Sequence, residues 1–206
     1  MAKKFLIVIA PEGFQEKEYS DTRRILENAG VLVSVASLEK GEPPHQLAKN
    51  STDGDGVTSK TEVMQSSEKG MSNWWGGEAI GARGGKISVD FSASEVSVGD
   101  YDGVAFIGGQ GMVGLVSEPK FTDLAKKFYE ANKIVAAICI APVILANAGI
   151  LKGKRATVCG GAENEIKNAG GIYTGKSVEI DGEIITANGP SAAEEFGKTI
   201  VKLLTE

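Results

Sequence analysis

Residues 134–142 are Ile-Val-Ala-Ala-Ile-Cys-Ile-Ala-Pro, and the other elements of the chain can be placed around them. The apolar run before Cys139 is too short to cross a membrane and is typical of a strand buried on both faces. After Cys139 the apolar residues recur at helical spacing as far as Gly149, which can end a helix. The pattern therefore predicts that Cys139 occupies a sharp turn between a strand and a helix.

This turn favours a functional role for Cys139. Ala137 and Ala141 are small, as a turn in which strand and helix backbones pass closely requires. The following helix would point its N-terminal amides at the sulfur, so we expect the thiolate to be favoured over the thiol. The alternative is a buried core cysteine, which is a common place for this residue.

The remaining apolar patterns predict an alternation of strands and helices. We expect strands at 5–10, 31–36, 86–91, 104–107 and 155–159, and helices at 16–29, 121–132 and 163–168. Residues 178–180 and 184–186 should form a hairpin, and a last helix should run from Ser191 to Leu204 with a capping box to Glu194. Strand, helix and strand in quick succession at the N-terminus imply a parallel sheet.

A glycine pair follows the predicted strand 104–107. In a parallel sheet of this kind the functional loops gather at the carboxyl ends of the strands, so Gly108 and Gly109 should lie near Cys139. The same loop also fits the dinucleotide-binding pattern G-x-G-x-x-G at 109–114. That fold needs a carboxylate at the end of the next strand, which here ends in Cys139, so nucleotide binding is not favoured.

Three motifs together resemble the ThiJ/PfpI superfamily: Ala-Ala-Ile-Cys-Ile-Ala-Pro, Ile-Gly-Gly-Gln at 107–110 and Ile-Thr-Ala-Asn-Gly-Pro at 185–190. The resemblance covers residues 3–42 and 86–206 of the chain. It implies a flavodoxin-like three-layer α/β/α sandwich with a mostly parallel sheet, similar to class I glutamine amidotransferases. It also implies a homodimer. The superfamily includes deglycases, glutathione-independent glyoxalases and PfpI-type intracellular proteases.

The resemblance further implies a catalytic pair, Cys139 and Glu18, and an oxyanion hole made by the backbone amides of Gly108, Gly109 and Ile140. Glu18 is placed by matching residues 13–18 to the family pattern, and Glu12 and Glu16 are the alternatives for its role. The carboxyl group could accept the proton of the thiol, or it could stay protonated and donate a hydrogen bond to a thiolate.

Two positions depart from the family pattern. Ile140 stands where many members have a histidine, and the only histidine of the chain is His45, so a Cys-His mechanism is not favoured. Cys159 falls where some relatives carry an active-site histidine. We expect Cys159 to lie close to Cys139 and to act as a resolving thiol, the alternative being a buried residue at the end of a strand.

Composition limits the classes of function. The 206 residues, 42% of them hydrophobic and 24% charged, fit a single soluble domain. A net charge of −5 without a basic stripe argues against nucleic acid as a partner, and no apolar run suggests a membrane segment. Two cysteines and no convincing signal peptide favour the cytoplasm. One histidine and two separated cysteines make a poor zinc set, so we expect no metal and no other cofactor.

Residues 43–85 interrupt this organisation. They are polar and rich in Gly and Ser, and a connection of this length is uncommon in a compact domain, so they are interpreted as an insertion. Trp74 and Trp75 would anchor the insertion to the domain, or form a lid or a subunit contact.

The favoured function is that of a cysteine enzyme acting on a small reactive carbonyl substrate, of the type that converts methylglyoxal to lactate, with Cys139 as nucleophile. Two alternatives remain open from the sequence. One is a stress sensor or chaperone that responds to oxidation of Cys139. The other is an intracellular cysteine peptidase or amidase, which would need a base beside the sulfur.

Overall fold

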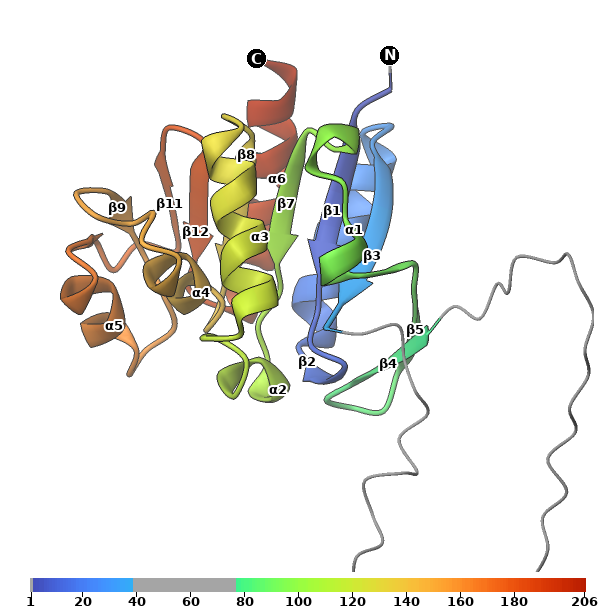
Figure 1. Cartoon of the computed structure of the whole chain (residues 1–206), viewed down its shortest axis with the longest axis horizontal. Coiled ribbons are helices and arrows are strands. Elements are labelled where there is room, and N and C mark those ends of the chain that lie inside the picture. The colour runs from blue at the N-terminus through green and yellow to red at the C-terminus, as the bar shows by residue number, and fades with distance from the viewer. Residues whose placement is uncertain (1, 39–76) are drawn as a thin grey trace, which may run out of the picture.

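The computed structural model describes residues 2–38 and 77–206, which form three layers, α/β/α (Figure 1). The central sheet has seven strands in the order β11-β12-β8-β7-β1-β3-β6. Every neighbouring pair is parallel except β11 and β12, which are antiparallel. The expected sandwich with a mostly parallel sheet is therefore confirmed. The strands are β1 (Lys4–Val8), β3 (Leu32–Ser37), β6 (Phe91–Ser92), β7 (Gly103–Phe106), β8 (Ile134–Ile138), β11 (Val178–Asp181) and β12 (Ile184–Ala187).

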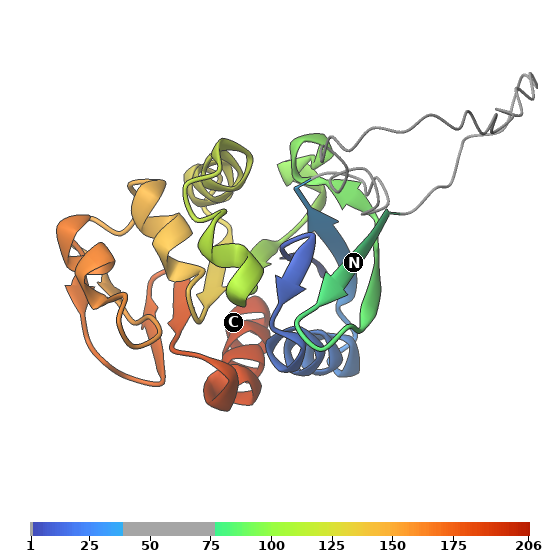
Figure 2. The same cartoon turned by 90° about the horizontal axis from the view of Figure 1, so that it is seen from below.

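Helices cover both faces of this sheet. α1 (Glu16–Asn28) and α6 (Ala193–Thr205) pack side by side on one face, and α3 (Pro119–Glu130) and α4 (Pro142–Asn147) lie on the other (Figures 1 and 2). Strand β8 is buried along its whole length because all five of its residues are apolar and both of its faces are covered. The strand that leads to Cys139 is thus an interior strand of the sheet, between β12 and β7.

Two small sheets flank the central one. β2 (Glu12–Phe14), β4 (Gly77–Gly81) and β5 (Lys86–Val89) form the first, and β9 (Arg155–Ala156) and β10 (Ile172–Tyr173) form the second. Short helices complete the chain: α2 (Gln110–Val113), α5 (Glu163–Asn168), η1 (Ala93–Glu95), η2 (Val98–Asp100) and η3 (Pro190–Ala192).

Three predictions about elements are corrected. The strand expected at 155–159 is only the two-residue β9, and it pairs with β10 outside the central sheet. The strand expected at 86–91 is divided between β5 and β6, which belong to different sheets. The last helix begins at Ala193 after the η3 turn, without a side-chain cap, so the capping box from Ser191 does not form.

The predicted insertion lies largely outside the described residues, and so do His45, Trp74 and Trp75. Its final part belongs to the fold: residues 77–81 form β4, which pairs with β2 and β5. The N–H of Gly85 donates to Glu16 Oε1 at 2.9 Å, which ties this hairpin to the start of α1.

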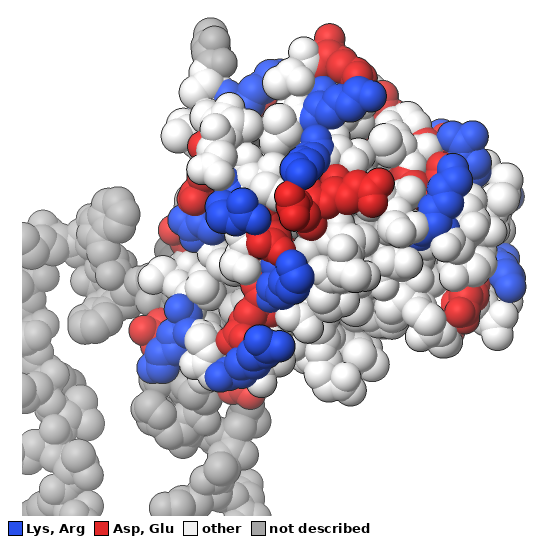
Figure 3. Space-filling model, turned by 180° about the vertical axis from the view of Figure 1, so that it is seen from behind, with Lys and Arg blue, Asp and Glu red and all other residues white. Residues whose placement is uncertain are grey.

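The face formed by α1 and α6 carries charges of both signs in close alternation (Figure 3). Ion pairs within each helix account for part of this pattern, among them Arg24 with Asp21 at 2.9 Å and Lys198 with Glu194 at 2.7 Å. This face therefore presents no continuous basic patch. Within the described parts of the chain, no helix combines the length and apolar character needed to cross a membrane.

Candidate functional site

Cys139 occupies the turn that directly follows β8. Its φ of +65° lies in the left-handed region, which is uncommon for a residue with a side chain. Its N–H donates to the carbonyl of Ala187 on β12 at 2.9 Å, and the N–H of Ala141 closes the turn on the carbonyl of Ile138 at 3.1 Å. The predicted strand–turn–helix is confirmed, and the side chain of Cys139 is half-buried rather than part of the core.

Gly108 allows the Cys139 side chain to occupy this place. A Cβ atom at Gly108 would lie 2.6 Å from Cys139 Cβ and 2.9 Å from the carbonyl oxygen of Ile138, both shorter than real contacts of a Cβ atom. The loops after β7 and β8 therefore approach each other more closely than any residue other than glycine would permit.

Gly109 allows a similarly close approach to strand β2 and to Gln15, which follows it. Its φ is +116°, and a Cβ atom there would lie 2.4 Å from the oxygen of Gly13 and 2.5 Å from the nitrogen of Gln15. The N–H of Gln15, which caps α1, donates to the carbonyl of Gly108 at 2.9 Å. Backbone thus packs on backbone, and the start of α1 is fixed relative to Cys139.

Glu18 lies in the first turn of α1 and is completely buried. Its Oε2 accepts a hydrogen bond from the N–H of Gly108 at 3.1 Å. Its Oε1 has no partner at standard hydrogen-bond geometry among the described residues, but the Cys139 thiol interacts with the carboxyl group closely enough to affect its pKa. The alternatives are placed elsewhere: Glu12 is exposed on β2, and Glu16 binds Gly85.

The backbone amides of Gly109 and Ile140 both donate to the Cys139 sulfur. The amide of Gly108 is already bonded to Glu18, so in this structure it faces the carboxylate instead of the space beside the sulfur. Of the three amides predicted to form an oxyanion hole, those of Gly109 and Ile140 interact with the sulfur and that of Gly108 binds Glu18; the oxyanion hole itself stays a prediction.

Burial is the main influence on the two reactive groups. It raises the pKa of Glu18 from 4.5 to about 7, opposed by the hydrogen bond from the Gly108 amide and by the neighbouring Cys139 thiol. It also raises the pKa of Cys139 from 9.0 to about 12, and the negative charges of Glu18 and of Cys159 act in the same direction. The resting pair near neutrality is therefore a thiol beside a carboxyl group close to its midpoint.

The expectation of a thiolate at Cys139 is wrong for this resting state. The helix that should have favoured the thiolate, α4, has only six residues, and Pro142 at its first position lacks an N–H. Its field is too weak to overcome the burial of the sulfur. The carboxyl group of Glu18 is consequently the group that can take the thiol proton when Cys139 reacts.

Cys159 lies next to Cys139, as predicted, although it does not end a strand of the central sheet. Its N–H donates to the carbonyl of Cys139 at 2.9 Å, and its thiol is hydrogen-bonded to the Cys139 thiol. Both cysteines are free and half-buried.

Sequence reasoning missed the residues that hold Cys159 in place. Thr186 Oγ1 accepts a hydrogen bond from the N–H of Thr157 at 2.9 Å, and both threonines are completely buried. The sequence did offer one sign of this contact, because Thr186 is the single polar residue in the otherwise apolar strand β12.

Potential metal ligands among the described residues, and a hollow near the start of α1, can be compared with this site. In residues 2–38 and 77–206, no group of three or more His, Cys, Asp and Glu side chains could hold a metal ion. A hollow of about 470 Å³ does lie beside the start of α1, lined by residues that include Phe14, Tyr19 and Arg83. Neither Cys139 nor Glu18 lines it, so it is separate from the thiol site.

Comparison with known proteins gives consistent matches over nearly the whole chain. The model of the DJ-1/PfpI family matches residues 3–203. An uncharacterised protein of Methanocaldococcus jannaschii is 35% identical over 204 residues, which cover 98% of this chain and 82% of that protein. An uncharacterised protein of Staphylococcus aureus is 29% identical over 206 residues, which cover 99% of each chain.

Solved structures agree with these matches. A ThiJ/PfpI domain protein from Brachyspira murdochii superposes with a TM-score of 0.80 at 28% identity, covering 99% of this chain and 97% of the other. DJ-1beta of Drosophila melanogaster gives a TM-score of 0.75 at 26% identity, covering 99% and 91%.

Proposed function

The chain belongs to the DJ-1/PfpI family, and from this premise we propose that it is a cysteine-dependent enzyme acting on small reactive carbonyl compounds. The reaction type is the conversion of a 2-oxoaldehyde such as methylglyoxal to the corresponding 2-hydroxy acid, with Cys139 as nucleophile and Glu18 as proton carrier. The observation that carries the proposal is the buried carboxyl group of Glu18, held by Gly108 beside the thiol of the strained residue Cys139.

The first step is addition of the sulfur to the aldehyde carbon. The Glu18 carboxylate accepts the thiol proton while the Cys139 sulfur forms the C–S bond, and the aldehyde oxygen becomes an alkoxide. The amides of Gly109 and Ile140, which interact with the Cys139 sulfur in the free protein, would donate to this oxygen once the sulfur has been alkylated. Return of the proton from Glu18 to the alkoxide gives a hemithioacetal and regenerates the carboxylate.

The second step moves a proton between neighbouring carbons. Glu18 removes the hydrogen from the carbon bonded to sulfur, which gives an enediolate. The hydroxyl proton on that carbon moves to the neighbouring oxygen, and Glu18 returns its own proton to the adjacent carbon. The product is the thioester of the 2-hydroxy acid on Cys139. Water then hydrolyses the thioester, so the net reaction adds one water to the 2-oxoaldehyde. A pKa of about 7 suits Glu18 to both directions of transfer, because the carboxyl group is poised near neutral pH.

The test is the formation of lactate from methylglyoxal, followed by NMR with the full chain. We expect turnover by the wild type and loss of it in Cys139→Ala and Glu18→Gln. Glu16→Gln is the matched control, because Glu16 lies on the same turn of α1 but binds Gly85 instead of approaching the thiol. Lactate formation that survives in Cys139→Ala would overturn the proposal.

The alternatives make different predictions in the same assay. A sensor would gain oxygen at Cys139 in peroxide without producing lactate. A peptidase would cleave peptide substrates and would need a base near the sulfur. The one histidine of the sequence, His45, lies outside the described residues.

A further inference from the structure

We propose that Cys139 and Cys159 form a reversible intramolecular disulfide in response to hydroperoxides. Cys139 is the thiol that the peroxide oxidises, and Cys159 is the thiol that resolves the oxidised sulfur. This inference does not depend on the carbonyl chemistry proposed above, because it requires only the two thiols, a proton acceptor and a hydroperoxide.

The first support is the direct contact between the two residues. The thiol of Cys159 is hydrogen-bonded to that of Cys139, and the N–H of Cys159 donates to the carbonyl of Cys139 at 2.9 Å. The two residues are 20 positions apart in sequence, yet backbone and side chains touch. Disulfides need Cα atoms within about 7 Å of each other, a condition that a direct backbone hydrogen bond between the residues favours.

The second support is the buried carboxyl group on the other side of the Cys139 sulfur. Glu18 is completely buried, and its Oε1 has no partner at hydrogen-bond geometry in the described chain. An acceptor of this kind can take the proton that must leave Cys139 before the sulfur attacks a peroxide oxygen. Cys139 thus has a proton acceptor in Glu18 and a second thiol in Cys159.

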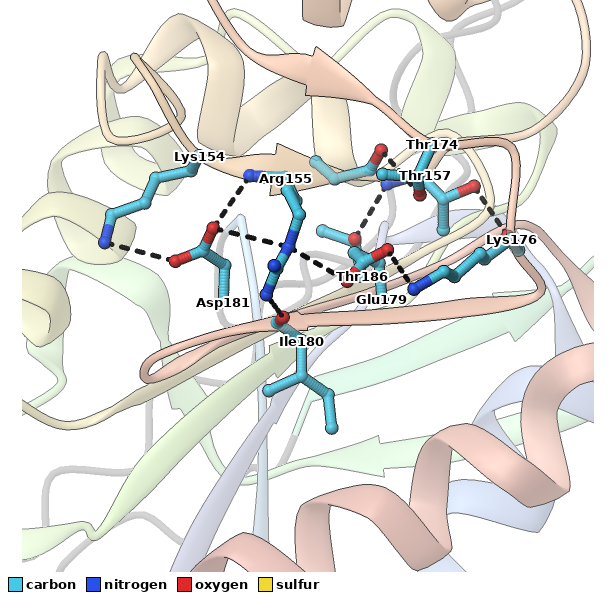
Figure 4. A network of polar contacts seen from close by, with 10 residues as sticks. Lys154, Arg155, Thr157, Thr174, Lys176, Glu179, Ile180, Asp181 and Thr186 are labelled. Atoms are coloured by element: carbon cyan, nitrogen blue, oxygen red, sulfur yellow. Dashed lines mark hydrogen bonds and ion pairs between the residues drawn. The ribbon is translucent and has the colours of Figure 1, made fainter.

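The third support is the way in which Cys159 is attached to the domain. Upstream, the segment is clamped to the sheet edge: Thr157 donates through its N–H to Thr186 and through its hydroxyl to the carbonyl of Lys176 at 2.7 Å (Figure 4). Asp181 accepts from the N–H of Arg155 at 3.0 Å, which fixes β9 (Figure 4). Cys159 lies beyond these clamps and outside any strand, so its side chain can approach the neighbouring sulfur without breaking the central sheet.

The reaction uses Cys139, Cys159 and Glu18, together with a hydroperoxide as oxidant and a dithiol as reductant. The Cys139 thiol gives its proton to Glu18, and the sulfur attacks one peroxide oxygen while the O–O bond breaks. The leaving oxygen takes the proton from Glu18 and departs as water or an alcohol, which leaves Cys139 as a sulfenic acid. The Cys159 sulfur then displaces the hydroxyl group, which leaves as water with the Cys159 proton, and a small dithiol restores both thiols by exchange.

The test uses the full chain treated with hydrogen peroxide, then blocked with N-ethylmaleimide and analysed by intact mass and peptide mapping. We expect the wild type to lose two hydrogen atoms and both alkylatable thiols, to show peptides cross-linked through Cys139 and Cys159, and to recover both thiols with dithiothreitol. In Cys159→Ser, Cys139 should instead gain two oxygen atoms as sulfinic acid, because no thiol intercepts the sulfenic acid.

Two further results would overturn the proposal. One is a wild type in which Cys139 becomes sulfinic acid while Cys159 stays alkylatable. The other is a disulfide that links two chains instead of two residues of one chain, detected as a doubled mass without reductant. Circular dichroism of Cys159→Ser, and of Cys139→Ser as the variant in which neither product should form, checks that each variant is folded.

Discussion

The two cysteines of the site are supported in opposite ways. Cys139 follows a fully buried interior strand of the sheet, and its surroundings are backbone packed on backbone at Gly108 and Gly109. Cys159 follows a two-residue strand outside the central sheet, and side-chain hydrogen bonds and ion pairs hold its segment. One thiol is fixed beside the buried carboxyl group of Glu18, and the other lies on a segment held by side-chain contacts.

The two kinds of support suit the two roles proposed for the thiols. A nucleophile needs its sulfur, proton acceptor and amide donors in one fixed arrangement, which close backbone packing provides. A resolving thiol needs only to reach the first sulfur after that sulfur has been oxidised. We therefore expect substitutions around Cys139 to be severe and those around Cys159 to be moderate.

The largest effect should come from Gly109→Ala. The added methyl group would fall within 2.4 Å of the carbonyl oxygen of Gly13 and 2.5 Å of the nitrogen of Gln15, and both are backbone atoms that cannot turn away. Together with the positive φ, this should lower the free energy of unfolding by more than about 3 kcal/mol, measured by urea denaturation. Gly114→Ala is the control, because Gly114 has a right-handed helical conformation and open space around it. Similar losses of stability in both variants would show that the close backbone packing at Gly109 does not require glycine.

The sequence predicts the central region well because its physical signals are local. An apolar run as long as β8, a glycine pair after β7 and a small-residue turn at Cys139 each have one favourable solution in a parallel sheet. The place of Glu18 came from the family resemblance and not from its neighbours in sequence, since an acidic residue in the first turn of a helix is usually exposed.

The outer region was harder to predict because its structure depends on long-range contacts. Residues 155–159 have the composition of a strand, but only Arg155 and Ala156 form strand pairing, with β10. The wrong expectation of an acidic thiol has a similar origin, since the burial that raises the pKa of Cys139 depends on the whole fold. The proximity of Cys159 was predicted correctly although the strand that should have carried it was not.

Glu18→Gln should have the next largest effect, and it depends on pH. Burial raises the pKa of Glu18 from 4.5 in the unfolded chain to about 7 in the fold, so its contribution to stability is complete below pH 4.5 and is lost as the pH rises through about 7. Gln cannot ionise. The free energy of unfolding of the variant, relative to that of the wild type, should therefore rise by about 3 kcal/mol between these pH values, because one unit of pKa shift corresponds to about 1.4 kcal/mol.

Urea denaturation at several pH values between 4 and 8 measures this difference. Glu163→Gln gives the opposite case, because its own backbone amide and that of Gly161 hold the pKa of that exposed carboxyl below its ordinary value. Glu163→Gln should therefore become less stable relative to the wild type as the pH rises, because the wild type gains the carboxylate that these amides favour. A difference between Glu18→Gln and wild type that does not change with pH would mean that Glu18 is not desolvated as described.

Thr186→Val tests the outer region. The substitution keeps the shape of the side chain but leaves the buried N–H of Thr157 without its acceptor, which should cost about 1–3 kcal/mol of stability. It should also reduce the yield of the disulfide between the two cysteines, because the segment before Cys159 loses its clamp. As a control, Thr199→Val should change stability by less than about 0.5 kcal/mol, because the Thr199 hydroxyl donates to the carbonyl of Glu195 on the solvent-facing side of α6. An unchanged disulfide yield in Thr186→Val would show that the clamp does not position Cys159.

The smallest effect concerns the strain at Cys139 itself. A residue with a Cβ atom pays roughly 1–2 kcal/mol for the left-handed region, and part of this is offset by the greater freedom of glycine in the unfolded chain. With φ at +65°, Cys139→Gly should therefore be more stable than Cys139→Ala by about 1 kcal/mol, although both lack the thiol. Ala137→Gly, two residues earlier in the buried strand β8, should be destabilised instead, since no positive φ favours glycine there. If Cys139→Ala proved the more stable of the pair, the turn would carry no strain, and the fixed placement of the sulfur would have to come from the glycine packing alone.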